Sequence, residues 1–311
     1  MIVKTVEWLT SRFSITKCKC FASCPRKFWY RYVVKIKEDP SPFLMVGRAV
    51  HTGQETDHWA KLRGEKLTTE QVLESAVSSL EEENEKAEID VSVDEFVNEH
   101  RRQLEIYEQS GERAKVNPVP GSIEAAFSLE VQAGDPEHGL KAATIEGFTD
   151  VVSQDSVTGD RTVIDMKTAG KPISKQELED HLQLTLEMMG AEAAQGKIVT
   201  FVRHAKQKAT TKVSEPVFNT QTKLERVLRF FADTIHAIRR AIKSGDFPKC
   251  APESHWCKPG ICTYFERCYG PDPNLHKYIT VEKINPVGSL PVPEWRESAA
   301  GKKERERTQA K

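Results

Sequence analysis

The sequence predicts an α/β protein in which helices flank a mixed central β-sheet, and three patterns support this class. Residues 144–152 and 161–168 mix β-branched and polar residues around a segment with turn composition, so they are expected to be paired strands. A helix is predicted over 174–196, because a capping-box pattern opens it and a glycine ends it; the apolar stretch 198–202 follows directly, which favours β-α-β connectivity. Apolar residues recur every three or four positions over 224–242, as in a long amphipathic helix.

The other predicted elements precede and follow these segments. Pro25 fits the first turn of an N-terminal helix with an aromatic face, and a loop with two prolines then leads to a helix that opens near Gly47. Residues 66–116 carry two charged amphipathic patterns, expected to be helices that pack on the core or over a groove. Residues 122–131 and 211–217 have the composition of further strands.

Composition bounds the class of protein. The chain has 311 residues, of which 29% are charged and 38% hydrophobic, and it carries a net charge of −1. No apolar run approaches the ~18 residues needed to span a membrane, and the start of the chain lacks the apolar segment of a signal peptide. The sequence therefore predicts a cytoplasmic protein without a membrane partner, in which any nucleic-acid contact uses a local basic surface.

The two central strands carry the candidate chemistry. Asp165 and Lys167 lie two positions apart and project from one face, whereas Ile164 and Met166 point to the opposite face. If the strands pair, Asp150 comes to lie beside Asp165, and two adjacent carboxylates repel unless a cation or a shared proton relieves them. A hard cation with bound water, next to a lysine, is suited to phosphodiester hydrolysis. The simpler alternative is a solvated hairpin.

Several segments resemble motifs of one family. Gly147-Phe-Thr-Asp150, followed by Ile164-Asp165-Met-Lys167-Thr168, resembles the signature of the PD-(D/E)XK nuclease superfamily, in particular its RecB-like branch. Gly47-Arg-Ala-Val-His51 is similar to the first motif of that branch, whose histidine helps to bind metal. The resemblance implies a restriction-endonuclease-like core in which Lys167 aligns the attacking water. The implied ligands of Mg²⁺ or Mn²⁺ are His51, Asp150, Asp165 and the carbonyl of Met166.

Further positions relate to the same pattern. The segment containing Gln183 resembles the Gln-x-x-x-Tyr motif of the branch, which implies that this amide positions the phosphate or the catalytic lysine. The tyrosine position is occupied by Glu187, and an added acid there would weaken DNA binding or alter metal coordination. Glu124 is similar to an acidic position on the first strand and is either a peripheral metal ligand or an ordinary exposed acid. Glu55, one helical turn after His51, either orients the histidine or is a surface acid.

Seven cysteines in a reducing compartment are expected to be ligands or buried thiols rather than disulfides. The segment from Ser23 to Tyr32 resembles the N-terminal cysteine motif of RecB-like nucleases with an iron–sulfur cluster, and a Pro/Gly-rich loop can bring three later thiols to one centre. This arrangement resembles the site of AddB-type and CRISPR-associated exonucleases. It implies a 4Fe-4S cluster that staples the two ends of the catalytic core. The implied ligands are Cys24, Cys257, Cys262 and Cys268.

Two features of the cysteines leave alternatives open. Four residues separate Cys257 from Cys262, where the family usually has two. Zinc held by four thiolates is the competing inorganic interpretation. The remaining thiols, Cys18, Cys20 and Cys250, are spare or alternate ligands.

The resemblance implies one nuclease domain over residues 1–270, with a helical insertion over about 60–117 and a catalytic core over about 120–218. Residues 271–311 are expected to be a flexible tail. The expected function is metal-dependent exonuclease cleavage at single- or double-stranded DNA ends in recombination, repair or phage DNA processing, with a helicase or recombination protein as partner. The alternatives are a non-catalytic DNA-end-binding module and a nuclease-fold scaffold subunit of a helicase–nuclease complex. Cleavage polarity and oligomeric state are left open by the sequence.

Overall fold

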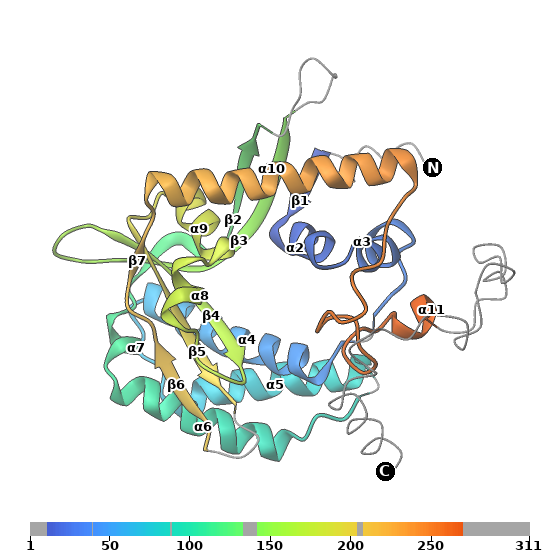
Figure 1. Ribbon diagram of the computed structural model, residues 1–311. Helices are drawn as coiled ribbons and strands as arrows, with labels where there is room; N and C mark the ends of the chain where they lie inside the picture. The colour runs from blue at the N-terminus through green and yellow to red at the C-terminus, as the bar shows by residue number, and fades with distance from the viewer. Residues whose placement is uncertain (1–10, 39, 88, 133–141, 204–207, 270–311) are drawn as a thin grey trace, which may run out of the picture. The chain divides into compact units, whose positions relative to one another are not determined.

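The computed structural model of the protein describes residues 11–38, 40–87, 89–132, 142–203 and 208–269 (Figure 1). The chain divides into two compact units, residues 1–264 and 265–311, and the predicted flexible tail over 271–311 lies outside the described residues. The larger unit is a mixed sheet with helices on both faces, which confirms the predicted fold class. No helix among the described residues is both long and apolar enough to cross a membrane.

The elements of the larger unit begin with β1 (Arg12–Ser14), α2 (Ile15–Ser23), α3 (Pro25–Phe28), the π-helix η1 (Trp29–Val33), α4 (Pro42–Leu62), α5 (Thr69–Ala87), α6 (Val93–Gln109) and α7 (Glu112–Lys115). They continue with β2 (Pro118–Val131), β3 (Ala143–Gln154), β4 (Arg161–Ala169), α8 (Lys175–Glu179), α9 (Leu182–Gly190), β5 (Gln195–Val202), β6 (Thr210–Val213), β7 (Val217–Phe218) and α10 (Gln221–Ser244). The described part of the smaller unit is α11 (Phe265–Tyr269).

Two strands, β1 and β4, share the second edge of strand β3, and the gap between them on this edge is called the β3–β4 fork. One edge pairs along almost its whole length with β2 in antiparallel register. The other edge pairs in parallel with β1 over residues 144–146 and then, in antiparallel register, with β4 over residues 151–154. The last pair before the fork is Val151 with Ile164. Residues 147–150 therefore have no strand partner at this edge among the described residues, which leaves room for polar side chains.

The parallel pair β4 and β5 forms the other half of the sheet. Residues 162–169 pair with 195–202, and α8 and α9 form the crossover between the two strands. Strands β6 and β7 both add to the far edge of β5, at opposite ends. The parallel pairing of β4 with β5 confirms the predicted β-α-β unit. Parallel strands that follow each other in the chain need such a crossover connection over one face of the sheet.

The two faces of the sheet have separate cores. Helices α4, α5 and α6 cover one face, where Ile164 and Met166 are buried with Val151 and Phe201. The opposite face is covered in part by α2 and α10, and in part by α8 and α9. Ile164 and Met166 thus point away from the face that carries Asp165, as the period of two in a strand requires.

Local geometry differs from the sequence prediction in three places. The helix predicted over 174–196 is two helices, because His181 adopts an extended conformation and caps α9, with Nδ1 accepting a hydrogen bond from the Leu184 amide (3.2 Å). Gly196 does not end a helix; it lies in β5, where a Cβ atom would come within 2.8 Å of Met188 Sδ. The helix expected to open near Gly47 starts at Pro42, since Ser41 accepts from the Leu44 amide as its N-cap (3.3 Å).

Candidate functional site

The fork between β3 and β4 brings the predicted acidic residues together. Asp150 precedes Val151 on β3 and Asp165 follows Ile164 on β4, so the two carboxylates lie just beyond the last paired residues. The Met166 amide donates a hydrogen bond of 2.5 Å to Asp150 Oδ2. In a continuous strand pair, the acceptor for such an amide would be a carbonyl oxygen of the neighbouring strand. The carboxylate of Asp150 thus replaces a missing strand partner and is fixed in position.

A chain of polar contacts runs from β4 to α9. Asp165 is fully buried, and its Oδ1 accepts hydrogen bonds from Lys167 Nζ (2.7 Å) and from Gln183 Nε2 (3.2 Å). Burial opposes the charge of Lys167, but Asp165 and Asp150 prevail and raise its pKa, so the lysine is a cation. Asp165 Oδ2 is buried without a hydrogen-bond partner among the described residues. An unpaired carboxylate oxygen beside a fixed cation is suited to bind a further positive centre.

A second group of ligands lies at the same fork. His51 Nδ1 of α4 lies 3.6 Å from Asp150 Oδ1, and ligand atoms of His51, Glu124 and Asp150 all lie within 4.8 Å of one another. Glu124 opposes Asp150 across the β2–β3 pair, since the pairs on either side of it are Ile123 with Val151 and Ala125 with Thr149. The group converges from one helix and two strands. It corresponds to a metal-ligand set of one imidazole and two carboxylates.

The backbone and electrostatics of this group are unusual. Glu124 has φ of +47°, a left-handed conformation that costs about 1 kcal/mol or more for a residue other than glycine. Partial burial, with the nearby charges of Asp150 and Glu55, raises the pKa of Glu124 to about 7. Burial also raises the pKa of Asp150, against the opposing influence of His51. A divalent cation would relieve both acids, so the residues present fit such an ion.

Helix α4 holds His51 in place through a buried ion pair at its far end. Asp57 accepts two hydrogen bonds from Arg113 of α7, at 3.1 Å and 2.6 Å. It also forms an ion pair with Lys61 at 2.9 Å. Glu55, expected either to orient His51 or to be a surface acid, accepts a hydrogen bond from Trp59 Nε1 (3.1 Å). Among the described residues it makes no hydrogen bond to His51. The position of the histidine therefore depends on the anchoring of the whole helix.

Glu187 extends the contacts of Asp165 into the protein interior. It is fully buried, and its Oε1 accepts a hydrogen bond of 2.7 Å from the same Gln183 Nε2 that contacts Asp165. Burial, together with the charge of Asp165, raises the pKa of Glu187 to about 9. This shift favours the protonated, uncharged form of Glu187 at neutral pH over the carboxylate that an acid at this position suggests from the sequence.

We expect Glu187→Gln to stabilise the protein, more strongly at pH 8 than at pH 5. The folded pKa of about 9 lies above the usual value of 4.5, so unfolding releases a proton and stability falls as pH rises between these values. The slope is at most about 1.4 kcal/mol per pH unit, so glutamine is expected to gain a few kcal/mol at pH 8. Urea unfolding in EDTA at the two pH values measures this; an equal gain at both would contradict the shifted pKa.

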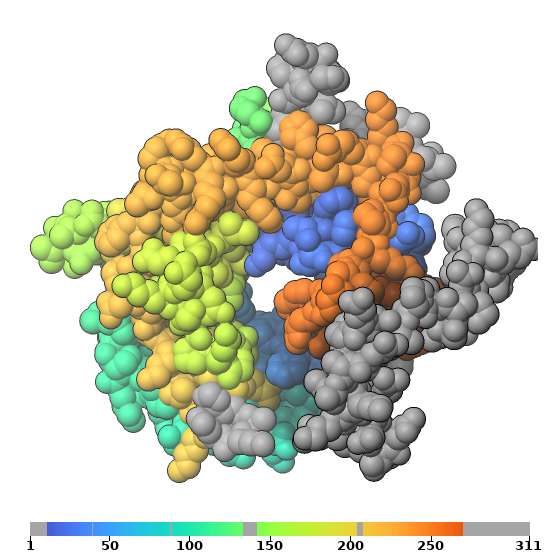
Figure 2. Space-filling model, in the orientation of Figure 1, coloured from blue at the N-terminus to red at the C-terminus, as the bar shows by residue number. Residues whose placement is uncertain are grey.

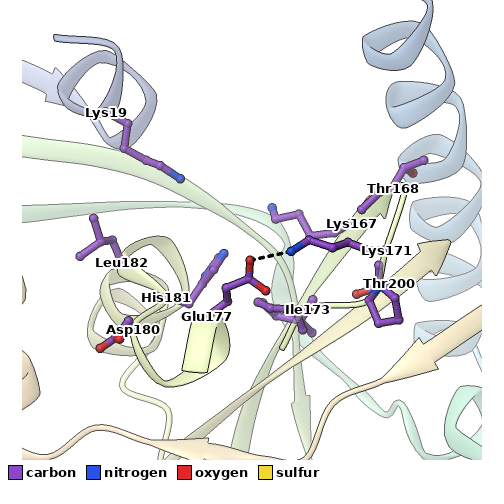
Figure 3. A pocket seen from close by; sticks show the side chains of 13 residues that line it. Lys19, Lys167, Thr168, Lys171, Ile173, Glu177, Asp180, His181, Leu182 and Thr200 are labelled. Carbon is purple, nitrogen blue, oxygen red and sulfur yellow. Dashed lines mark hydrogen bonds and ion pairs between the residues drawn. The ribbon is translucent and has the colours of Figure 1, made fainter. Parts of the chain in front are cut away.

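A pocket adjoins this site on the α2 side of Lys167 (Figure 3). It has a volume of about 540 Å³, and its lining includes Lys19 of α2, Lys167, Lys171 and His181. Neither Lys19 nor His181 belongs to the motifs that the sequence shares with the nuclease family. Lys19 lies far in sequence from Asp165 and Lys167 and approaches them only through the packing of α2, whereas the position of His181 two residues before Gln183 was an available signal.

The cysteines of the larger unit lie in two places. Cys24 is the N-cap of α3, and its Sγ accepts a hydrogen bond from the Lys27 amide (3.5 Å). The thiol of Cys250 forms side-chain hydrogen bonds with Cys24 and Cys257; burial and these contacts raise its pKa to about 12. Cys262 follows a turn in which its amide donates to the Lys258 carbonyl (3.0 Å). The structure therefore places Cys250, which the sequence left as a spare or alternate thiol, between two of the predicted ligands.

The loop that carries these thiols docks on the N-terminal helices through other contacts. The Arg26 amide donates to the Pro248 carbonyl (3.1 Å), and the Tyr264 hydroxyl donates to the Ile36 carbonyl (3.0 Å). Aromatic rings add to the contact, since Tyr30 stacks on Tyr264 with 5.1 Å between the ring centroids. Cys24, Cys250 and Cys257 are thus gathered by ordinary packing. Cys268, the remaining predicted ligand, lies in α11 of the smaller unit.

Comparison with known proteins places the chain in a family. No curated protein gave a sequence match. Among solved structures, a candidate exonuclease from Eubacterium rectale is similar, with a TM-score of 0.48, 12% identity and 95% of each chain covered. The protein SSO0001 gives a TM-score of 0.32 with 14% identity over 71% of this chain and 84% of its own. The model of the PD-(D/E)XK nuclease superfamily matches residues 12–269, and the chain therefore belongs to that superfamily.

Proposed function

We propose that this protein is a RecB-like, metal-dependent DNA exonuclease. The observation that carries the proposal is the arrangement at the β3–β4 fork, where Asp150 faces His51 and Asp165 contacts Lys167. A solvated hairpin, the simpler interpretation of the two strands, would leave these side chains exposed. Instead Asp165 is fully buried, and such a charge is retained in a core only where it is paired or binds a cation.

The proposed roles follow from this geometry. His51, Glu124, Asp150 and Asp165 would hold Mg²⁺ or Mn²⁺, with the carbonyl of Met166 as a further ligand. The bound ion would lower the pKa of a water molecule and neutralise charge on the phosphodiester. Lys167 would align that water and stabilise the charge that develops on the phosphate. Gln183, which donates to Asp165, would keep Asp165 and Lys167 aligned.

The biological setting is part of the proposal. The substrate would be a single- or double-stranded DNA end in recombination, repair or phage DNA processing, with a helicase or recombination protein as partner. Residues 1–270 would form the nuclease domain. A non-catalytic DNA-end-binding module and a scaffold subunit are the competing functions. The retained pair of Asp165 and Lys167 weighs against both, because a binding surface gains nothing from a buried carboxylate with an unpaired oxygen.

Digestion of end-labelled linear DNA and covalently closed circular DNA, with Mg²⁺ or Mn²⁺ and with EDTA, tests the function. Anaerobically purified full-length protein is expected to degrade the linear DNA alone, and only with metal. The order in which labelled ends are released would give the polarity. Cutting of the circle would indicate an endonuclease, and binding without any metal-dependent cleavage would support the binding module.

We further propose that Cys24, Cys257, Cys262 and Cys268 hold a 4Fe-4S cluster with a mainly structural role. The proposal is supported by the contacts of the Cys250 thiol with both Cys24 and Cys257, which show that these two proposed ligands lie close together. Clusters of this type need four thiolates that converge from distant segments. Zinc on the same thiolates is the alternative.

Anaerobic preparations of two cysteine variants are expected to differ. Cys268→Ser should abolish the visible absorbance of the cluster and lower the thermal midpoint, because a proposed ligand is lost. Cys250→Ser should retain both, since it removes a neighbour of the ligands rather than a ligand. The reverse pattern would assign Cys250 as the fourth ligand, and a colourless wild-type protein that contains zinc would favour the alternative.

A further inference from the structure

The lining of the pocket beside Lys167 includes Lys19, a cation that has no role in the proposed hydrolysis. Of the charged residues in its lining, Lys167 pairs with Asp165, Lys171 with Glu177 at 3.2 Å and Asp180 with Arg226. The Lys19 side chain makes no hydrogen bond or ion pair with any described residue. A lysine left unpaired beside other charged groups is available for a ligand.

Lys19 is an exposed residue of α2 whose side chain is directed toward Lys167. In Figure 3 its side chain extends from α2 toward the end of Lys167. Burial and the charge of Lys167 lower the pKa of Lys19, and Asp165 opposes them, so all three act on one another across the pocket. In Figure 2 the surface of the larger unit is hollowed between the blue residues of α2 and the yellow-green residues of α8. Two lysines that converge on such a hollow repel each other until an anion lies between them.

His181 supplies a neutral donor to the same space. Its Nδ1 accepts the Leu184 amide, so the proton of the neutral ring is on Nε2. Burial lowers the pKa of His181 to about 4, which keeps the ring neutral at physiological pH. Figure 3 shows the ring pointing into the pocket, between Lys19 and Lys167. The imidazole can therefore donate one hydrogen bond to a ligand while its other nitrogen caps α9.

The rest of the pocket offers apolar surface. Pro172, Ile173 and Leu182 lie in its lining, and Figure 3 shows Leu182 and Ile173 on either side of His181. Its volume of about 540 Å³ is within the range of ~300–1,000 Å³ typical of small-ligand sites. One part of the pocket offers cations and a neutral hydrogen-bond donor, which suit a phosphate. Another part offers apolar side chains, which suit the sugar and base joined to that phosphate.

We propose that this pocket binds the nucleotide adjacent to the scissile phosphodiester, with its phosphate between Lys19 Nζ and the Nε2–H of His181 and its sugar and base against Ile173 and Leu182. The inference depends on the proposed nuclease function and extends it, because it assigns a second phosphate position to the same substrate. Lys19 and His181 are thus substrate-binding residues, and Lys167 lies between this phosphate and the one that is cleaved.

Binding of a fluorescent single-stranded oligothymidylate, followed by anisotropy in EDTA, tests the pocket without catalysis. Lys19→Ala is expected to weaken binding about fivefold at 0.1 M salt and to reduce the slope of log affinity against log salt by about 0.7, the value for one phosphate contact on a single strand. Lys86→Ala is the matched control, since Lys86 is an exposed lysine of α5 paired with Glu82 at 3.0 Å, and it should change neither quantity. An unchanged slope for Lys19→Ala would overturn the proposal.

His181→Asn separates ligand binding from helix capping. Asparagine is a good N-cap residue, so the thermal midpoint should stay near that of the wild type, but its side chain is too short to replace the Nε2–H donor. Weaker oligonucleotide binding at unchanged stability is expected, and unchanged binding would remove His181 from the site. Thymidine monophosphate should displace the oligonucleotide at lower concentration than inorganic phosphate does. Equal competition by the two would reject a nucleotide as the occupant.

The outcomes also distinguish this inference from the proposed function. If metal-dependent cleavage is present and is lost in Asp165→Asn, while Lys19→Ala binds like the wild type, the pocket assignment fails and the nuclease function stands. If DNA binding depends on Lys19 but no variant or metal gives cleavage, the nuclease function fails, and the pocket is then part of a DNA-binding surface.

Discussion

Replacement of Asp165 by asparagine is expected to reduce metal-dependent DNA cleavage by about three orders of magnitude or more. The substitution removes the negative charge that holds Lys167 Nζ at 2.7 Å and the carboxylate oxygen left without a partner. Asparagine has nearly the same shape, so the core side chains Ile164 and Met166 keep their places and the fold is retained. Rates of release from end-labelled linear DNA in Mg²⁺, with thermal unfolding of the same samples, measure the effect.

Asp246→Asn is the control for this experiment. Asp246 is an exposed residue just after α10, so the same chemical change there should leave the cleavage rate within about twofold. Cleavage by Asp165→Asn at the wild-type rate, in a folded protein, would show that the fork between β3 and β4 is not the nuclease centre. Lys167→Met should lower the rate as well, because Lys167 is the cation next to the proposed water.

Arg113→Met is expected to lower the free energy of unfolding by about 3 kcal/mol, near the lower end of the range for breaking a buried ion pair. The side chains of Arg113 and Asp57 are only 3% and 1% exposed, so methionine leaves a carboxylate buried with Lys61 as its remaining partner. Urea unfolding measures the loss. Because Asp57 anchors the helix that carries His51, metal affinity should also decrease.

Arg101→Met isolates the role of burial. Arg101 makes a similar two-pronged contact with Glu70, at 3.0 Å and 3.1 Å, but the side chains are 39% and 65% exposed. Solvent screens such a pair, so the free energy of unfolding should hardly change. Similar losses in the two variants would mean that burial is not what makes the Arg113 contact strong.

Part of the site could be predicted from short-range patterns. Asp165 and Lys167 share a face because of the period of two in a strand, and Ile164 and Met166 enter the core on the other face for the same reason. Gln183 could be placed near them because a crossover helix must pack beside the strand that it follows. Each of these inferences needs only a periodicity and a connection rule.

Other contacts needed the assembled fold. A helix pattern alone did not reveal the break at His181, since the cap forms only when the ring turns to accept the Leu184 amide. The place of Cys250 beside Cys24 depends on the docking of the C-terminal loop against α3. Glu124 is an exposed residue, and only the β2–β3 register shows that it lies opposite Asp150.

The sequence by itself determined the α/β class, the strand pair that carries Asp165 and Lys167, and the motifs that identify the family, because period, turn composition and residue spacing are local properties. Only the tertiary structure decided the charge state of Glu187, the approach of Lys19 to Lys167 and the convergence of His51 with Glu124 and Asp150. Burial and long-range contact set the cost of a charge, and neither is encoded in the order of neighbouring residues.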